Sequence, residues 1–213
     1  MGTYEQGILG AFSGLVGPVV GSSFRGKSVM RGRPRKSKKL PTPAQLAQRE
    51  RFSAVTRFMT PAREILSQFF GMPSGSRSRY NMATSYYLQE AVATVGAEAV
   101  ILYHKALFSK GTLLQPQNLE AEAVGSKRLE LKWQDNSEQG NAKIDDRLLV
   151  VLFEPETELY EFFLGAGTRA RGEAVLNLPG YLVGQNVECW AFMVSNDNVL
   201  KSTSQYLGKH LIS

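Results

Sequence analysis

The chain has 213 residues, 43% hydrophobic and 21% charged, a composition typical of a soluble globular protein with one large or two small domains. A single cysteine, Cys189, excludes an internal disulfide, and two histidines, His104 and His210, leave little material for a metal or histidine-based active site. Residues 1–96 carry 14 lysines and arginines against 4 acidic residues, whereas residues 97–213 carry 11 against 15. The N-terminal part is therefore the one expected to meet an anionic partner.

The N-terminal segment is rich in glycine. Residues 7–24 carry no charge over 18 positions, the length of a short membrane span, but five glycines, three serines and a proline make them too weakly apolar for one. The glycine spacing would fit a stripe on a helix, yet each glycine costs about 1 kcal/mol in a helix interior, which favours turns and short strands. We predict a buried β segment that ends in a hairpin, in which Arg25 and Gly26 join residues 18–24 to residues 27–31.

Residues 21–28, GSSFRGKS, match the phosphate-binding pattern G-x-x-x-x-G-K-[ST]. That pattern binds phosphate where it joins a buried parallel strand to the N-terminus of a helix. Here Gly32 and Pro34 prevent a sustained helix, and the downstream chain lacks the alternation of strands and helices that a parallel nucleotide-binding sheet requires. We therefore interpret the match as accidental, with glycines that shape the hairpin and a solvated Lys27.

The basic stretch that follows resembles an AT-hook, a peptide that binds the DNA minor groove. Its glycine would let the backbone approach the groove floor, while the flanking arginines would seek the negative potential there. Interleaved aromatic residues are scarce, which disfavours single-stranded nucleic acid. The alternatives, which we favour, are a solvated linker and a basic surface that docks an acidic protein partner. The candidate binding residues are Arg31, Gly32, Arg33, Pro34, Arg35, Lys36, Lys38 and Lys39.

A long helix is predicted next. Thr42 suits the N-cap position, Pro43 the first turn, and Gln45 completes a capping box. Pro61 interrupts the apolar repeat, so we expect a kink or two short helices, with Thr60 able to cap the second. The inward positions are Phe52, Val55, Phe58, Met59, Ala62, Ile65, Leu66 and Phe69.

A connector over residues 71–78 leads to a second predicted helix over residues 80–96, which Asn81 would cap. Its inward side chains would be Tyr87, Leu88, Ala91, Val92 and Val95.

After Gly96 the periodicity changes from helical to alternating, with a strand candidate over residues 98–111. Seven further strands are predicted between turn signals, at residues 118–124, 128–133, 147–154, 158–165, 173–178, 186–194 and 204–212. They indicate an antiparallel β-sandwich, and the fold class is α+β. The predicted parts are a glycine-rich β arm with the basic stretch (1–40), a helical segment (41–96), a connecting strand (97–116) and the sandwich (117–213).

No catalytic constellation emerges, so an enzyme is not expected, and neither are a catalytic residue, a metal, another cofactor or a small-molecule substrate. We interpret Cys189 as a buried, inert thiol and both histidines as surface or structural residues. Asp145 and Asp146 are interpreted as turn residues. A solvated acidic edge that discourages sheet pairing is predicted from Glu154, Glu156, Glu158 and Glu161.

Several segments together resemble an uncharacterised family of small Bacteroidota proteins over most of the chain. They are MGTYEQGILGAFSGLVGPVVGSS, the FRG turn, MRGRPRK, PTPAQLAQRERF, YNMATSYYL, LFSKGTLL and STSQYLG. Members usually carry tryptophan where this chain has Phe24, and they often lack the Gly-Lys-Ser and Arg-Gly-Arg-Pro sequences, which argues against both motif hypotheses. No activity is established for that family, so the resemblance implies none.

The part from Gln117 onward separately resembles a fibronectin type III or immunoglobulin-like sandwich, through LELKW ending at Trp133, LPGYLVGQNVECWAFMV and STSQYLG. Such a scaffold implies adhesion, spacing or assembly and no particular chemistry. We predict a non-catalytic structural or interaction protein, a subunit of a larger assembly that binds a protein partner or itself. A phage- or prophage-derived particle is one hypothesis for that assembly.

The alternative is a DNA-associated protein that binds through residues 31–39. No membrane partner is expected. Since no secretory signal is recognisable, we expect a cytoplasmic location, or association with a virion or another particle.

Overall fold

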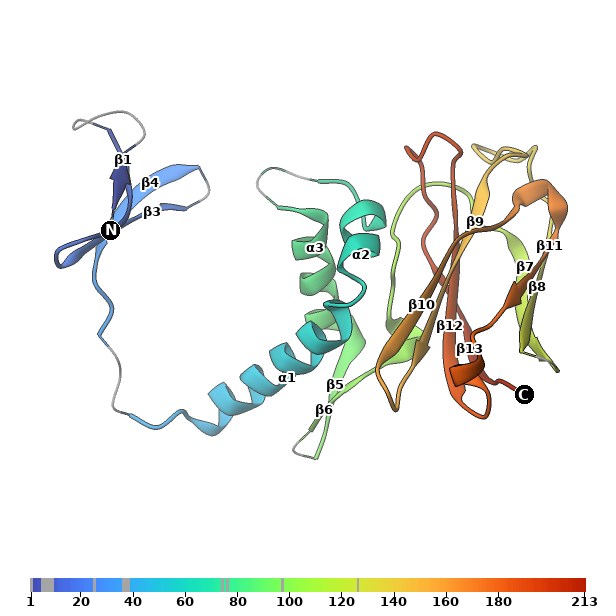
Figure 1. Ribbon diagram of the computed structural model, residues 1–213. Helices are drawn as coiled ribbons and strands as arrows, with labels where there is room; N and C mark the ends of the chain where they lie inside the picture. The colour runs from blue at the N-terminus through green and yellow to red at the C-terminus, as the bar shows by residue number, and fades with distance from the viewer. Residues whose placement is uncertain are drawn as a thin grey trace.

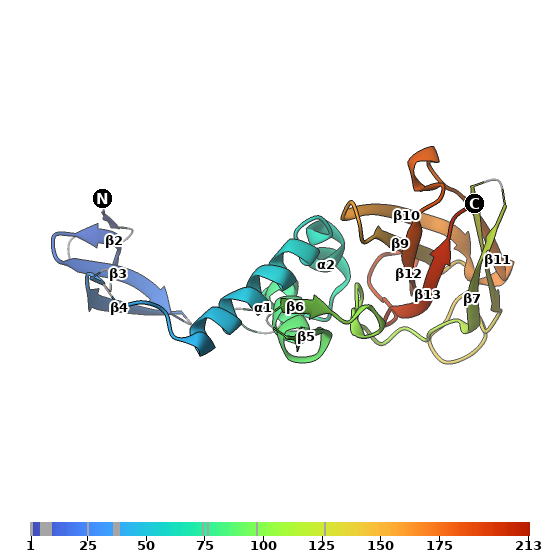
Figure 2. The ribbon, with the colours of Figure 1, turned by 90° about the horizontal axis from the view of Figure 1, so that it is seen from below.

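A computed structural model describes residues 2–4, 10–24, 26–35, 39–73, 75, 77–96, 98–125 and 127–213. A small sheet near the N-terminus is followed by a helical segment and then by a β-sandwich (Figure 1). The small sheet lies apart from the rest in both views, whereas the helices lie against one side of the sandwich (Figures 1 and 2). Among the described residues, no helix has both the length and the apolarity needed to cross a membrane.

The N-terminal sheet, here called the arm sheet, has the antiparallel order β1-β2-β3-β4. Its strands are β1 (Thr3–Tyr4), β2 (Phe12–Val16), β3 (Val19–Phe24) and β4 (Lys27–Gly32). The predicted hairpin is confirmed, because Phe24 pairs with Lys27 and Gly26 adopts the left-handed φ of 77° that the tight turn requires. The prediction of a buried segment is wrong: Gly21 is the one buried residue among those of the arm whose exposure is described. Among the described residues, no second layer covers this sheet.

The first predicted helix is present as two helices, α1 (Pro43–Met59) and α2 (Arg63–Phe69). The capping box of α1 is confirmed, since the Gln45 amide donates to Thr42 Oγ1 at 3.3 Å and the Thr42 amide donates to Gln45 Oε1 at 3.1 Å. The break at Pro61 is confirmed as well. Thr60 does not cap α2, because its hydroxyl donates back to the Thr56 carbonyl at 2.6 Å.

Most of the predicted inward side chains of these two helices are buried, but Phe52 is 51% exposed. The buried residues of α1, Val55, Phe58 and Met59, all lie in its C-terminal part and Phe52 precedes them, so a correct helical period does not bury it.

The second predicted helix is shorter than expected. Helix α3 (Arg79–Tyr86) is capped by Ser78, whose hydroxyl accepts the Asn81 amide at 3.2 Å, so the predicted Asn81 cap is wrong. A π-helical turn, η1 (Tyr87–Ala91), then leads into a hairpin of β5 (Val92–Val95) and β6 (Glu98–Ile101).

The hairpin places Val95 at 65% exposure, which corrects its predicted inward position. The β-branched residues of VATVG before the left-handed Gly96 favour this hairpin over a continued helix. The predicted strand over 98–111 is a strand only in β6, and a short 3-10 helix, η2 (Tyr103–Lys105), follows it.

All seven predicted strands of the sandwich are confirmed. They are β7 (Gln117–Val124), β8 (Arg128–Gln134), β9 (Arg147–Glu154), β10 (Leu159–Thr168), β11 (Glu173–Asn177), β12 (Asn186–Val194) and β13 (Gln205–Leu211). One sheet has the order β10-β9-β12-β13 and the other the order β11-β8-β7, with antiparallel pairs throughout.

Two hydrophobic cores lie on opposite faces of the four-stranded sheet. In the core between the sheets, Leu129, Leu131 and Trp133 of β8 meet alternate residues of β9 and β12. The other residues of β9 and β12 face the helices, where Phe58 of α1 packs edge-on against Phe153 with ring centroids 5.0 Å apart. Strands β9 and β12 are therefore buried on both faces, which explains their continuous apolar sequences.

Candidate functional site

The arm sheet presents apolar and basic side chains together on one exposed face. Residues directly opposite each other in the β3–β4 pair lie on the same side of the sheet, so Val20 lies beside Arg31 and Phe24 beside Lys27. Phe24 is 62% exposed, and Met30 on the opposite face is 73% exposed. Neither core of buried side chains includes a residue of the arm among those described. The apolar side chains Phe24 and Met30 of the arm therefore stay exposed in the single chain.

The glycines of the apparent phosphate-binding pattern have structural roles. Gly21 pairs with Gly14 across the sheet, and a Cβ atom on Gly21 would lie 2.1 Å from the Phe12 carbonyl oxygen. Gly26 forms the hairpin turn, Lys27 is exposed, and a strand follows where a nucleotide-binding loop needs a helix. The interpretation of this motif as a hairpin is confirmed.

The described part of the predicted basic site lies beside the turn between β2 and β3. Arg31 and Gly32 end β4, and the Arg33 amide donates to the Pro18 carbonyl at 2.7 Å. A shallow hollow there is lined by Gly17, Pro18, Gly32, Arg33, Pro34 and Arg35. Lys36 and Lys38 lie outside the described residues, whereas Lys39 is exposed and Leu40 follows it toward α1.

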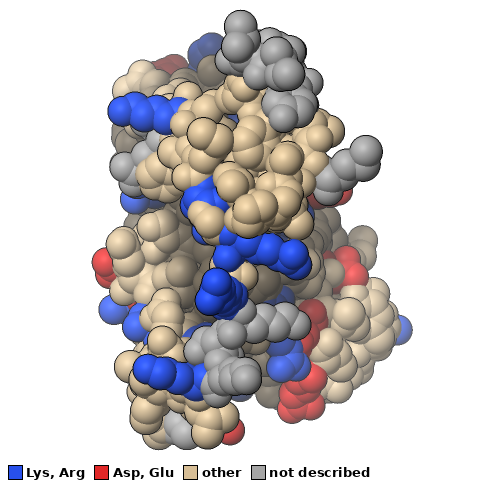
Figure 3. All heavy atoms as spheres, turned by 90° about the vertical axis from the view of Figure 1, so that its left-hand side faces the viewer, with Lys and Arg blue, Asp and Glu red and all other residues tan. Residues whose placement is uncertain are grey.

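The charged side chains of this region are exposed to solvent. Arg31, Arg33 and Arg35 are exposed, and none of them pairs with an acidic side chain of the described chain. Seen from the arm, lysine and arginine side chains are spread over the visible face and acidic ones lie mainly toward its edges (Figure 3). The backbone of this segment is already engaged, because Gly32 pairs with Val19 and the Arg33 amide donates to the Pro18 carbonyl. Binding of the segment in a DNA groove as an AT-hook would break these contacts.

The predicted acidic edge is corrected at Glu154, which is only 2% exposed. Its carboxylate accepts hydrogen bonds from the Glu156 amide at 2.8 Å, the Thr157 amide at 2.6 Å and the Thr157 hydroxyl. Burial acts to raise the pKa of Glu154, but these hydrogen bonds outweigh it and hold that pKa below its usual value. Glu154 therefore stabilises the β9–β10 turn, while Glu158 forms an exposed ion pair with Arg57 at 2.6 Å.

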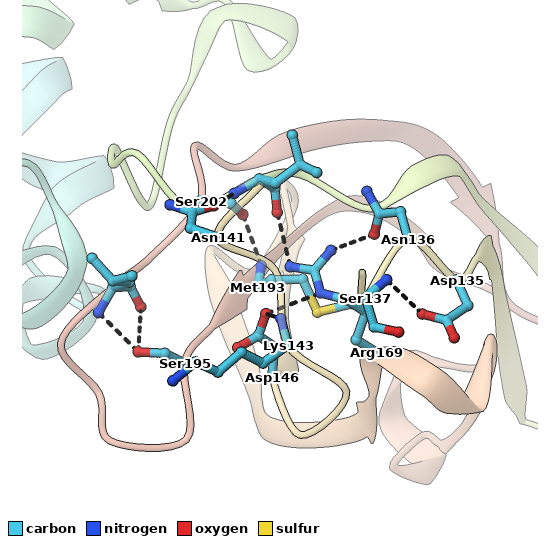
Figure 4. A network of polar contacts seen from close by, with 12 residues as sticks. Asp135, Asn136, Ser137, Asn141, Lys143, Asp146, Arg169, Met193, Ser195 and Ser202 are labelled. Carbon is cyan, nitrogen blue, oxygen red and sulfur yellow. Dashed lines mark hydrogen bonds and ion pairs between the residues drawn. The ribbon is translucent and has the colours of Figure 1, made fainter. Parts of the chain in front are cut away.

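A buried ion pair, which the sequence did not indicate, joins the loops at one end of the sandwich (Figure 4). Arg169 Nε donates to Asp146 Oδ2 at 3.0 Å, and both side chains are buried. The Arg169 guanidinium also donates to Asn136 Oδ1 at 2.6 Å and to the Leu114 carbonyl at 2.8 Å. The prediction of Asp146 as a mere turn residue is corrected, because its carboxylate anchors the buried arginine.

This network is enclosed and structural. The Arg169 carbonyl accepts the Trp133 indole N–H at 2.8 Å, so the network connects three loops with the core between the sheets. Each of the three guanidinium nitrogens of Arg169 donates a hydrogen bond within the protein.

The remaining candidate reactive side chains are the single cysteine and the two histidines. Cys189 is fully buried, and burial raises the pKa of its thiol well above the usual value, which suppresses the reactive thiolate. His104 is exposed, and the Nε2 atom of His210 lies 3.1 Å from the Leu207 carbonyl oxygen. Among the described residues, no group of three histidine, cysteine or acidic side chains is placed to hold a metal ion.

Comparison of the chain with known proteins places it in a family but gives no activity. A family of unknown function, DUF6266, matches residues 11–208. No curated protein matches the sequence. The Bacteroidota origin stays a prediction.

Two solved structures that match are fibronectin type III domains. The fn3 domain of the human collagen alpha-1(XX) chain shares 13% identity over 49% of this chain and 91% of its own, with a TM-score of 0.35. The FN5 domain of Drosophila Lar shares 11% identity over 48% of this chain and 99% of its own, with a TM-score of 0.31. At this level of similarity neither domain says what this chain binds.

The order of the strands in the two sheets comes from the structure of this chain and not from the TM-scores of the matched domains. The two sheets have the strand order of a fibronectin type III sandwich. One sheet contains β11, β8 and β7, and the other contains β10, β9, β12 and β13. With its α+β fold and a match that spans most of its length, the chain belongs to the family of unknown function DUF6266.

Proposed function

We propose that this protein is a non-catalytic structural subunit that assembles with further copies of itself, and that the arm sheet is the element that docks. The observation that carries the proposal is that both faces of the arm sheet are exposed, one with apolar and basic side chains together and the other with Met30. The helices and the sandwich bury their own apolar faces in two cores, whereas no second layer covers the arm sheet in the part of the chain that the structure describes.

Covering the arm would be favourable. Complete burial of an exposed side chain such as Phe24 or Met30 contributes about 1.5–3 kcal/mol each. A small sheet without a packed face is marginal in water, so docking would also stabilise its strands. Strand β4 is exposed at all six positions, which leaves its outer edge accessible, and Lys27 and Arg31 discourage indiscriminate pairing along that edge.

Charge complementarity favours a second copy as the occupant. Residues 1–40 hold eight basic residues and one acidic residue, whereas residues 97–213 hold four more acidic than basic residues. Exposed Glu120 and Glu122 on β7, at the edge of the three-stranded sheet, offer a negative surface to a neighbouring arm. Such an arm-to-sandwich contact is heterologous, so it builds a closed ring or an extended array. A phage- or prophage-derived particle stays our hypothesis for the setting, motivated by this layout.

The test is molar mass by size-exclusion chromatography with light scattering, over a wide concentration range. The variant Arg31→Glu/Arg33→Glu/Arg35→Glu reverses the arm charge, and Lys105→Glu/Lys143→Glu/Arg171→Glu reverses three exposed charges outside the arm and outside β7 as a control. We expect the wild type and the control to grow in mass with concentration and the arm variant to stay monomeric. A wild type that is monomeric at every concentration would contradict the proposal.

DNA binding is the second candidate, favoured by the exposed Arg31, Arg33 and Arg35 that pair with no acid of the described chain. The same proteins are titrated with AT-rich and GC-rich duplexes across a salt series. An AT preference that survives physiological salt and is lost in the arm variant would favour the DNA-associated protein. Weak binding that disappears near physiological salt would support assembly.

A further inference from the structure

A cavity of ≈ 520 Å³ opens on the helical side of the molecule, far from the arm in sequence. Four segments line it: the chain after α2, the side of α3, residues 110–112 and residues 199–203. Three of its lining residues are cationic, Arg77, Lys110 and Lys201, and none of the lining residues is acidic. Its volume is that of a site for a small molecule.

Lys201 is the unusual member of this lining. The residue is only 4% exposed, yet its ammonium has no hydrogen-bond or ion-pair partner among the described residues. The Lys201 Nζ atom is not one of the buried side-chain atoms that lack a hydrogen-bond partner among the described residues, so Nζ keeps contact with solvent. The cavity that Lys201 lines provides that contact. A buried charge without a counter-charge is expensive, and proteins normally pair it.

The backbone holds Lys201 in this position. Its carbonyl accepts the Leu113 amide at 3.0 Å. Gly111 packs so closely against Lys201 that an added Cβ would lie 2.1 Å from the Lys201 carbonyl oxygen and 2.8 Å from its Cγ atom. The base of the side chain is thus fixed, unlike that of a surface lysine whose whole side chain moves in water.

The surroundings of Lys201 add to the positive potential. Burial, and then the charge of Arg79, lower the pKa of Lys201. Lys110 lies with its Nζ atom 5.5 Å from the centre of the Tyr86 ring at the exposed side of the cavity. An anion that enters the cavity would therefore meet one sheltered cation and two exposed ones.

One part of the remaining lining is apolar and aromatic, and Ser85, Gln89, Thr112 and Thr203 add neutral polar groups elsewhere in it. Phe70, Met82 and Tyr86 form part of the wall, and the rings of Phe70 and Tyr86 lie 5.9 Å apart at a tilted angle. These side chains suit a flat apolar body and have no strong polar group to satisfy.

We propose that this cavity binds a small anionic ligand, a carboxylate or a phosphate ester that carries a flat apolar group. The anion lies against Lys201, with Lys110 and Arg77 toward solvent, and the apolar group lies against Tyr86, Phe70 and Met82. This site is independent of the proposed assembly through the arm sheet.

The test uses benzoate, phenyl phosphate and inorganic phosphate as probes, by isothermal titration calorimetry on the full chain. We expect benzoate or phenyl phosphate to bind, and Lys201→Met to weaken that binding at least about tenfold. Lys209→Met removes an exposed lysine of β13 and serves as the matched control with unchanged affinity. Comparison of benzoate with phenyl phosphate tells which anionic group the site prefers.

Thermal unfolding of the same variants separates binding from packing. Without a probe, Lys201→Met is expected to unfold at the same or a higher temperature than the wild type, because it removes a partly desolvated, unpaired ammonium and keeps a similar side-chain volume. If Lys201→Met fails to fold, the variant Lys110→Met/Arg77→Met is titrated with the same probes, and we expect it to bind them more weakly than the wild type does. The proposal is overturned if no aromatic probe binds the wild type, or if these variants bind the probes as well as Lys209→Met does.

Discussion

The arm sheet and the sandwich use the same kinds of side chain with opposite results. Valine, phenylalanine and methionine are buried in β9 and β12, because the second sheet covers one face and the helices cover the other. In β3 and β4 the same residue types remain partly or fully exposed. Apolar strands therefore become a core where the chain supplies a second layer, and we propose that another copy supplies that layer for the arm sheet.

The largest effect is expected at the contact between the helices and the sandwich. Phe58→Ala removes a ring that packs against Phe153 and Trp190, and we expect a loss of about 3–5 kcal/mol in the free energy of unfolding. Chemical denaturation followed by circular dichroism and tryptophan fluorescence measures it. Because the helices share a core with the sandwich, both signals should change in one transition. Separate transitions would show that the two parts are less coupled than the core indicates.

The buried network provides the next test. Asp146→Ala leaves Arg169 with two of its three hydrogen-bond partners, and we expect a loss of about 3 kcal/mol. The neighbouring Asp145 is exposed, so Asp145→Ala is the matched control, expected within about 0.5 kcal/mol of the wild type. Equal effects of the two substitutions in denaturant titrations would mean that the ion pair does not stabilise the loops.

A smaller loss is expected where the chain passes from the arm into the helices. Thr42→Ala removes the capping box of α1 and should lower the free energy of unfolding by about 1 kcal/mol. Ser53→Ala changes an exposed residue inside the same helix and should leave stability nearly unchanged. If Thr42→Ala were as stable as Ser53→Ala, the start of α1 would be frayed in the free protein.

The smallest effect on monomer stability belongs to the arm itself. Met30→Ala should change the free energy of unfolding of dilute protein by less than about 0.5 kcal/mol, whereas Met193→Ala in β12 should lower it by about 2–5 kcal/mol. Light scattering on concentrated protein should show the reverse order, with Met30→Ala reducing assembly. A large loss of monomer stability in Met30→Ala would mean that the arm is already covered within one chain.

The sequence predicts the sandwich well because its signals are local. Alternation in LELKW, the continuous apolar runs of β9 and β12, the capping box at Thr42 and the break at Pro61 each lie within a few residues. The helix predicted over residues 80–96 was too long, since helical periodicity and β-branched content compete in VATVG.

The features that the sequence did not predict depend on distant residues. Asp146 and Arg169 are 23 positions apart, so no local pattern joins them. Lys201 has no local signal at all, because the segments around its cavity meet only in the fold. The exposure of the arm was missed for the opposite reason: its apolar pattern is that of a buried sheet, and none of the described segments covers it.

Amide hydrogen exchange of the arm at low and high protein concentration tests the central claim most directly. We predict that amides in the hydrogen-bonded strands β3 and β4 exchange fast in dilute protein and slow markedly in concentrated protein, while those of β9 and β12 stay protected in both. Arm amides that exchange equally fast at both concentrations, or that are already protected in the dilute monomer, would contradict the claim that the arm sheet docks on another copy.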